Sequence, residues 1–166
     1  MNLLIGVPVL VALVMLQTIV VSTLPLLHGT ADVVLLVVIA WALQERVPSG
    51  FEWGLTGGLM VGAITAMPFY VPLASYLAAV GLARLLRRRV WQTPLLAMFV
   101  ATIGGSLIYQ ILSWTVLRIQ GVPLPIVESL NQVVLPATLL NLVLALPVYA
   151  VVTDLAQSVY PEEVNL

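Results

Sequence analysis

The chain has 166 residues, of which 61% are hydrophobic and only 8% carry a charged side chain. Soluble domains carry about 25% charged residues, so this chain has too little charge to cover a surface that faces water. We therefore interpret residues 1–166 as a single domain of an integral membrane protein. The formal net charge of −1 favours neither nucleic acid nor a strongly charged partner.

Six transmembrane helices are expected along the chain, because each span needs about 20 apolar residues. The first 27 residues carry no charged side chain, unlike the basic start of a signal peptide, so they predict a first span that is retained. Zero cysteines and one histidine, His28, exclude a disulfide framework and a cysteine–histidine metal site. The expected spans cover about 5–26, 30–46, 50–67, 72–89, 93–117 and 130–153.

The second, third and fourth spans leave the number of crossings open. The second is short and reaches across only if it starts at Thr30. The charge-free run over residues 53–83 is too long for one ordinary span, and the sequence MPFYVP interrupts it at residues 67–72. Ser49 and Glu52 have the spacing of a capping box, which predicts a helix start near residue 50. We prefer two helices joined by a tight turn, with one long kinked helix and five spans as the alternative.

The positions of the basic residues indicate the orientation of the chain in the membrane. With six spans and both termini in the cytoplasm, only Arg118 of the six arginines faces outward, whereas the reverse arrangement places five of the six outside. The five-span alternative exposes Arg46 outside. The cytoplasmic basic patch serves as a topology anchor or as a docking site for lipid headgroups or protein; it consists of Arg84, Arg87, Arg88 and Arg89.

Small residues recur at every fourth position of the third span, at Gly54, Gly58, Gly62 and Ala66. Helices in lipid associate through close backbone packing and interhelical hydrogen bonds. This stripe therefore predicts either packing within the chain or a docking face for a partner helix. Shorter stripes of the same spacing are Ser75, Ala79 and Ala83 in the fourth span, and Ala97, Ala101 and Gly105 in the fifth.

The last span contains VVLPATLLNLVLALPVY at residues 133–149. At 100° per residue, Asn131, Asn141 and Ala145 share one arc, and Pro136 and Pro147 lie opposite. Each proline leaves a carbonyl without its usual partner, which a membrane helix must satisfy elsewhere. We therefore expect Asn141 to point into the bundle and this helix to be surrounded by protein on most sides.

Chemistry-bearing residues are sparse. Asp32 is the one acid placed within a span; it is either an ion or proton site or, as we prefer, the dipole-stabilised first turn of a helix. Gln17 and Gln110 are expected to donate interhelical hydrogen bonds. The seven acids include no pair at metal-ligand spacing within a helix, and no serine pairs with a histidine or lysine motif. We expect no enzymatic activity, cofactor or metal.

The order of these features resembles the MreD family of rod shape-determining membrane proteins. The similarity includes Leu16-Gln17 in the first span, GTADVVLLVVIAWAL at residues 29–43 and GLTGGLMVGA at residues 54–63. The most specific match is the family's Pro-x-x-x-x-Asn-x-x-x-x-x-Pro pattern at Pro136, Asn141 and Pro147. Relatives often carry an acid at the end of the glycine-rich span, where this chain reads GAITAM.

The resemblance implies an all-α, six-helix transmembrane bundle similar to the substrate-binding subunits of energy-coupling-factor transporters. It implies a scaffold of the cell-elongation and peptidoglycan-synthesis machinery in the bacterial inner membrane, in contact with membrane lipid. The implied partners are the transmembrane helix of MreC, the glycosyltransferase RodA with its transpeptidase, and MreB filaments.

The alternative function is a substrate-binding subunit of a vitamin transporter of that type. It needs an outward polar pocket, for which the candidates are His28, Arg118, Gln120, Glu128, Asn131 and Gln132. The short alanine motifs that dock such subunits are not evident in the first span.

Overall fold

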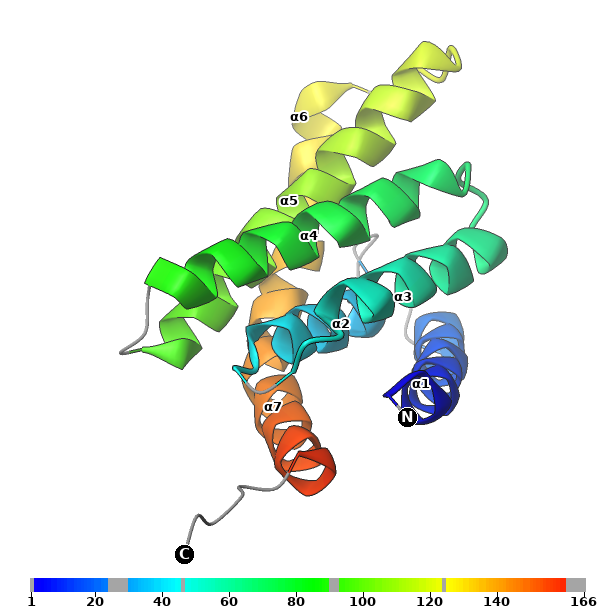
Figure 1. Ribbon diagram of the computed structural model, residues 1–166. Helices are drawn as coiled ribbons and strands as arrows, with labels where there is room; N and C mark the ends of the chain where they lie inside the picture. Colours follow the sequence, from blue (N-terminus) through cyan, green and yellow to red (C-terminus); the bar gives the residue numbers. More distant parts are fainter. Residues whose placement is uncertain (1, 24–29, 46, 90–92, 124, 161–166) are drawn as a thin grey trace, which may run out of the picture.

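The computed structural model describes residues 2–23, 30–45, 47–89, 93–123 and 125–160, with side chains omitted for 2–5, 20–23 and 89. All regular secondary structure in these ranges is helical (Figure 1). The elements are α1 (Asn2–Thr23), α2 (Val33–Leu43), α3 (Gly50–Ile64), α4 (Tyr70–Arg89), α5 (Pro94–Ile119), α6 (Ile126–Ser129), the π-helical segment η1 (Leu130–Val134) and α7 (Leu135–Val159).

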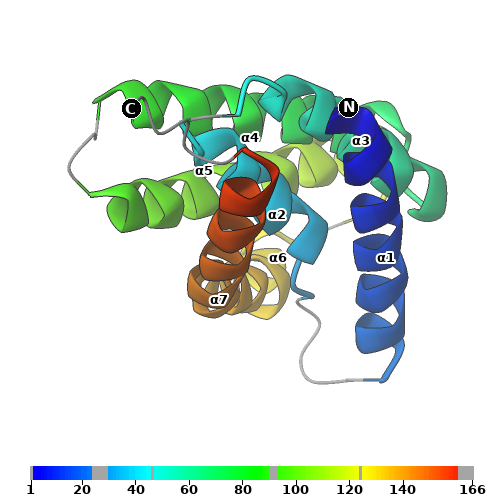
Figure 2. The same ribbon diagram turned by 60° about the horizontal axis from the view of Figure 1, so that its bottom comes forward.

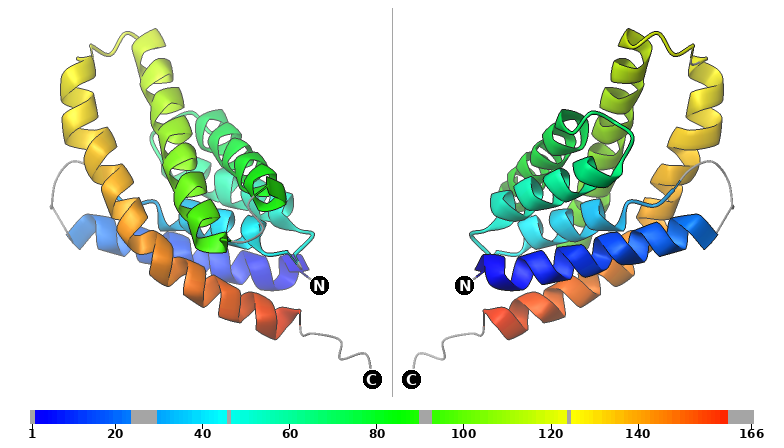
Figure 3. Two further views of the ribbon diagram at one scale, coloured as in Figure 1. Left: turned by 90° about the vertical axis from the view of Figure 1, so that its left-hand side faces the viewer. Right: turned by 90° about the vertical axis from the view of Figure 1, so that its right-hand side faces the viewer.

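Two helical rods of the described chain are long and apolar enough to cross a membrane. They are Pro94–Ile119, which is α5, and Ile126–Val159, in which α6, η1 and α7 are continuous. Figure 3 shows these two rods extending together beyond the end of α4. A helix overlaps each of the six expected ranges, but membrane crossing by all six stays a prediction.

Helix α2 forms the centre of the molecule. It packs against α1, α3, α4, α5 and α7, and every residue from Val34 to Leu43 is buried. A helix that is apolar all round must be buried in this way. Its 11 residues span only about 16 Å at 1.5 Å per residue, roughly half of a 30 Å hydrocarbon core. The helix is shorter than the span expected over about 30–46, and its cap residues Asp32 and Gln44 are half-buried.

Helices α3 and α4 form a hairpin rather than one kinked helix, and they lie side by side in Figures 1 and 3. The glycine stripe makes this packing possible. A Cβ atom on Gly58 would lie 2.9 Å from Cα of Leu73, and one on Gly62 would lie 3.1 Å from Cα of Phe69. A Cβ atom on Gly54 would lie 2.8 Å from a methyl group of Val80. The three glycines of the stripe are thus occupied within the chain, whereas Ala66 follows the end of α3 and is exposed.

The predicted capping box at the start of α3 does not form as expected. Ser49 is the N-cap residue, but its side chain makes no capping hydrogen bond. Its hydroxyl instead accepts a hydrogen bond from Nε1 of Trp41 at 3.3 Å. Trp41 in turn stacks on Trp53, with ring centroids 4.2 Å apart. The serine therefore joins α2 to the start of α3 instead of closing the first turn.

The small residues of α4 and α5 also face the interior. A Cβ atom on Gly105 would lie 3.1 Å from Cβ of Ala79 and 2.9 Å from Cδ1 of Ile39, so α5 approaches both α4 and α2 closely at this level. All members of the two shorter stripes are buried: Ser75, Ala79, Ala83, Ala97, Ala101 and Gly105.

Helix α7 buries one face and exposes the other along its length. Asn141 and Ala145 are buried, whereas Pro147 is exposed. Leu139 is 61% and Val143 is 71% exposed. The expectation that this helix is surrounded by protein on most sides is wrong for the described chain, because only the arc containing Asn141 faces the other helices.

The π-helical segment η1 lies immediately before Pro136. The backbone N–H of Leu135 donates to the carbonyl of Leu130, five residues earlier. This wider turn accommodates one extra residue in the rod. No residue of η1 is buried, and its main neighbours are α6 and α7 of the same rod. Asn131 is exposed, and Pro136 is half-buried in the first turn of α7.

Candidate functional site

The N-terminal end of α2 carries the densest polar cluster of the described chain. The first N–H groups of a helix have no intrahelical acceptor, and here three side chains supply one. Oδ1 of Asp32, the N-cap residue, accepts from the N–H of Leu35 at 3.0 Å. Oε1 of Gln17 in α1 accepts from the N–H of Val34 at 3.2 Å. Oδ1 of Asn141 in α7 accepts from the N–H of Asp32 at 2.8 Å.

Two further helices contribute to the same cluster. The hydroxyl of Tyr76 in α4 donates to Oδ1 of Asp32 at 2.7 Å. The side-chain amide of Asn141 donates to the hydroxyl of Ser106 in α5 at 2.9 Å. We call Gln17, Asp32, Tyr76, Ser106 and Asn141 the Asp32 cluster. It joins α1, α2, α4, α5 and α7 through side chains that are otherwise surrounded by apolar residues.

A pocket of about 410 Å³ opens beside this cluster. Asp32 is the only charged residue among those lining it, and no basic side chain of the described chain does so. The remaining polar groups are hydroxyls and amides. The lining residues are Gln17, Thr18, Thr30, Ala31, Asp32, Leu35, Val61, Ile64, Thr65, Ser106, Tyr109, Gln110 and Asn141.

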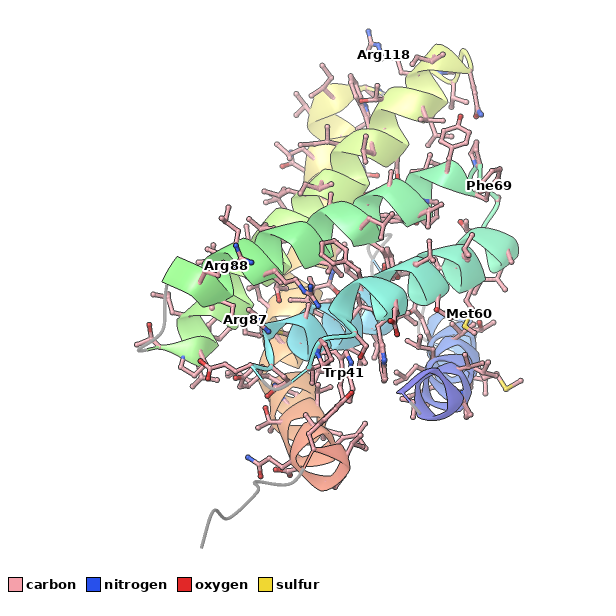
Figure 4. The ribbon with its side chains drawn as sticks, viewed as in Figure 1. Trp41, Met60, Phe69, Arg87, Arg88 and Arg118 are labelled. Atoms are coloured by element: carbon pink, nitrogen blue, oxygen red, sulfur yellow. The ribbon has the colours of Figure 1, made fainter. Side chains whose placement is uncertain are left out.

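Two arginines of the basic patch lie near the C-terminal end of α2. Nη1 of Arg87 donates to the carbonyl of Gln44 at 2.7 Å. Nη2 of Arg84 donates to the carbonyl of Pro48, and its guanidinium lies 4.7 Å from the ring centroid of Phe51. Arg88 is exposed, and Figure 4 shows it with Arg87 at the same end of α4. The side chain of Arg89 lies outside the described residues.

Both ends of the described chain lie near this arginine end. A Cβ atom on Gly6 in α1 would lie 2.9 Å from the Trp53 ring, and Tyr160 follows α7 with its ring 6.4 Å from that of Trp41. The Asp32 cluster lies at the opposite end of α2. Helix α1 otherwise lies to one side of the other helices, as Figure 2 shows.

The sequence located part of this site. Asp32 is the N-cap residue that the dipole argument favours, and Gln17 makes an interhelical hydrogen bond, as an acceptor. Gln110 lines the pocket. Tyr76 and Ser106 were not singled out, although both lie beside the small-residue stripes of α4 and α5, where a polar side chain inside an apolar run is a usable signal.

The polar residues proposed for an outward pocket do not form one. Arg118, Gln120 and Glu128 are exposed around the junction of α5 and α6, and Gln132 is exposed in η1. Arg118 stacks over Trp114 at 5.0 Å, and Figure 4 shows it at the far end of α5 from Arg88. None of them lines the pocket beside Asp32, and His28 lies outside the described residues.

Among the described residues, no group of three or more histidine, cysteine, aspartate or glutamate side chains could hold a metal ion. The arrangement can bind a polar molecule beside Asp32 and can hold helices together. Comparison of the chain with protein-family models, with curated proteins and with solved structures found no match.

Proposed function

We propose that the chain is a non-enzymatic scaffold of the bacterial cell-elongation machinery, similar to MreD, and that it binds the transmembrane helix of an MreC-type partner. The observation that carries the proposal is the Pro136, Asn141 and Pro147 pattern. Its asparagine holds α7 against α2 and α5, while Pro147 lies on the exposed face. RodA, its transpeptidase and MreB would join the complex through this partner.

The proposed membrane arrangement has both termini in the cytoplasm of a multi-pass inner-membrane protein. It is supported by the position of Arg84 and Arg87 at the same end of the bundle as Gly6 and Tyr160. Basic residues are retained on the cytoplasmic side, so this end would face inward and the Asp32 cluster outward.

The exposed face of α7 is the proposed docking surface for the partner helix. The glycine stripe is unsuitable because α4 already covers it. The face of α7 is apolar along the rod, and its most exposed members are Leu139, Val143 and Val151. A membrane helix needs close side-chain packing to bind there, so a bulky residue in the middle of the face should interfere.

Co-purification in detergent with the MreC-type protein of the same genome tests the function. The parent chain should retain that protein, Val143→Trp should lose it, and Ile111→Trp on the exposed side of α5 should behave as the parent. Depletion of the chain should turn rod-shaped cells round. Absence of the partner from the purified protein, together with unchanged cell shape, would contradict the scaffold role.

One observation favours the transporter alternative. The pocket beside Asp32 is lined from α1, α2, α3, α5 and α7, as a solute-binding subunit requires. If that function is correct, a vitamin should raise the unfolding temperature of the purified protein, and an energising ATPase complex should co-purify with it. A vitamin panel that leaves the unfolding temperature unchanged argues against it.

A further inference from the structure

The pocket beside Asp32 has a charge balance that restricts its ligands. We propose that it binds a small hydroxylated primary amine, whose ammonium group pairs with the Asp32 carboxylate and whose hydroxyl groups bond to the neutral polar side chains. This inference rests on the pocket alone, and it holds whether the chain acts as a scaffold or as a transporter subunit.

The carboxylate of Asp32 has no positively charged partner in the described chain. Its hydrogen-bond donors include the hydroxyl of Tyr76 and the N–H of Leu35, and both are neutral. The chain has no lysine. Arg84 and Arg87 are bound to carbonyls at the other end of α2. A partly buried carboxylate is stabilised by an opposite charge, and an ammonium group entering the pocket would supply it.

The same balance disfavours anionic ligands. A phosphate or carboxylate would lie beside the charge of Asp32, and the described side chains that line the pocket include no guanidinium, ammonium or imidazole group to offset it. Like charges at such short distances repel strongly where little water is present. The pocket therefore selects neutral or cationic molecules.

The remaining polar lining consists of groups that both donate and accept hydrogen bonds. Hydroxyls come from Thr30, Thr65 and Tyr109, and amides come from Gln17 and Gln110. Such groups match the hydroxyls of a sugar or an amino alcohol. The volume of about 410 Å³ is near the lower end of the usual range for ligand pockets, roughly 300–1,000 Å³, which suits a single ring and not an oligomer.

Binding to the purified full chain in detergent tests the inference. The probes are D-glucosamine and ethanolamine, with D-glucose and N-acetyl-D-glucosamine as matched neutral molecules, each titrated by calorimetry. Glucosamine should bind at least roughly tenfold more tightly than the two neutral sugars, about 1.4 kcal/mol. If neither amine binds up to millimolar concentration, or if glucosamine and its neutral counterparts bind equally, the proposal is wrong.

Two variants test whether the carboxylate of Asp32 causes the preference for glucosamine. Asp32→Asn retains an oxygen acceptor for Tyr76 and Leu35 but removes the charge, so it should abolish the preference for glucosamine over glucose. Glu52→Gln removes an exposed carboxylate of α3 outside the pocket and should bind as the parent does. A folded Asp32→Asn protein that keeps the preference would overturn the proposal.

A third variant changes a pocket residue outside the Asp32 cluster, so that the test does not depend on the folding of Asp32→Asn. Should Asp32→Asn fail to fold, Tyr109→Phe tests the pocket instead, because it removes one lining hydroxyl while the charge remains. It should weaken glucosamine binding several-fold and keep the preference over N-acetyl-D-glucosamine. Glucosamine binding by Tyr109→Phe with unchanged affinity would place the sugar outside this pocket and contradict the proposal.

Discussion

The two ends of α2 use different chemical groups to satisfy the backbone N–H and C=O groups that have no partner within the helix. At the N-terminal end, backbone N–H groups are bound by the oxygens of Asp32, Gln17 and Asn141. At the C-terminal end, the carbonyl of the C-cap residue Gln44 is bound by the guanidinium group of Arg87. Acceptors thus meet the positive end of the helix dipole, and cations meet the negative end.

The difference lies in the surroundings of these groups. Asn141 is buried and is reached through a pocket, whereas Arg84 and Arg87 are only partly covered. Water can replace an arginine at the second end, but it cannot easily replace an asparagine in the first. A short apolar helix therefore depends most on a partner that is itself buried, here Asn141, since unsatisfied backbone groups are most costly away from water.

Asn141→Leu should disrupt the hydrogen bonds at the N-terminal end of α2 and have the largest effect on stability. It removes the acceptor of the Asp32 N–H and the donor to Ser106. Membrane hydrogen bonds contribute about 0.6 kcal/mol each and up to about 1.7, so the loss of two should destabilise the protein by about 2 kcal/mol. Unfolding in detergent, followed by tryptophan fluorescence, measures it, with Val143→Ala on the exposed face of the same helix as the control.

A cysteine reporter separates local opening from global loss of stability. The chain has no native cysteine, so Thr30→Cys places a single thiol beside the pocket. Asn141→Leu should accelerate labelling of this thiol, and Val143→Ala should not. Equal labelling rates and equal stability in the two variants would show that Asn141 does not hold this end of α2.

Gly58→Ala should disturb the same end indirectly. Its Cβ atom would lie 2.9 Å from Cα of Leu73 and 3.3 Å from Cβ of Tyr76, so α4 must move and carry Tyr76 away from Asp32. We expect a destabilisation of about 1–2 kcal/mol from this overpacking. Gly81→Ala in α4, where nothing lies within 4 Å of the new atom, should be neutral or slightly stabilising. Similar unfolding curves for the two variants would contradict close α3–α4 packing.

Tyr76→Phe removes a single hydrogen bond from the cluster. The tyrosine ring is fully buried and its hydroxyl donates to Asp32, and phenylalanine keeps the ring in place. The expected destabilisation is about 1 kcal/mol, measured by the same unfolding experiment. Tyr149→Phe, whose side chain is partly exposed on α7, is the matched control, and a larger effect at Tyr149 than at Tyr76 would be incompatible with the described geometry.

Arg87→Met tests the C-terminal end of α2 and should have the smallest effect on stability. It keeps an unbranched side chain but removes the donor to the carbonyl of Gln44. Because water can reach this carbonyl, the loss should be about 0.5 kcal/mol or less. A destabilisation as large as that of Asn141→Leu would remove the difference between the two ends of α2.

Sequence periodicity predicted elements and faces well where the helix is regular. The hairpin of α3 and α4 followed from the two prolines around residues 68–72 and from the length of the apolar run. The position of Asn141 on the inner face followed from 100° per residue. The same count failed for Asn131, because η1 lies where the rod buries no residue against the other helices.

Burial of whole helices was less predictable. Residues 33–43 and 135–159 are both strongly apolar, yet α2 is entirely enclosed while α7 exposes one face. In a chain expected to lie in lipid, apolar residues suit the interior and the membrane-facing surface equally well. Only the polar residues distinguish an interior helix face from a membrane-facing one. The partners of Asp32 come from positions 44 and 109 residues away in sequence, which local patterns do not reach.

The π-helical turn before Pro136 accommodates one residue more than a regular helical turn of the same rod. Removing one residue from positions 130–134 would restore a regular helix, leave Asn141 seated between α2 and α5, and keep the residues before the turn facing as they do now, because the wider turn absorbs the extra residue. A single-codon deletion in this stretch should therefore leave both the core and the tip of the protein in place.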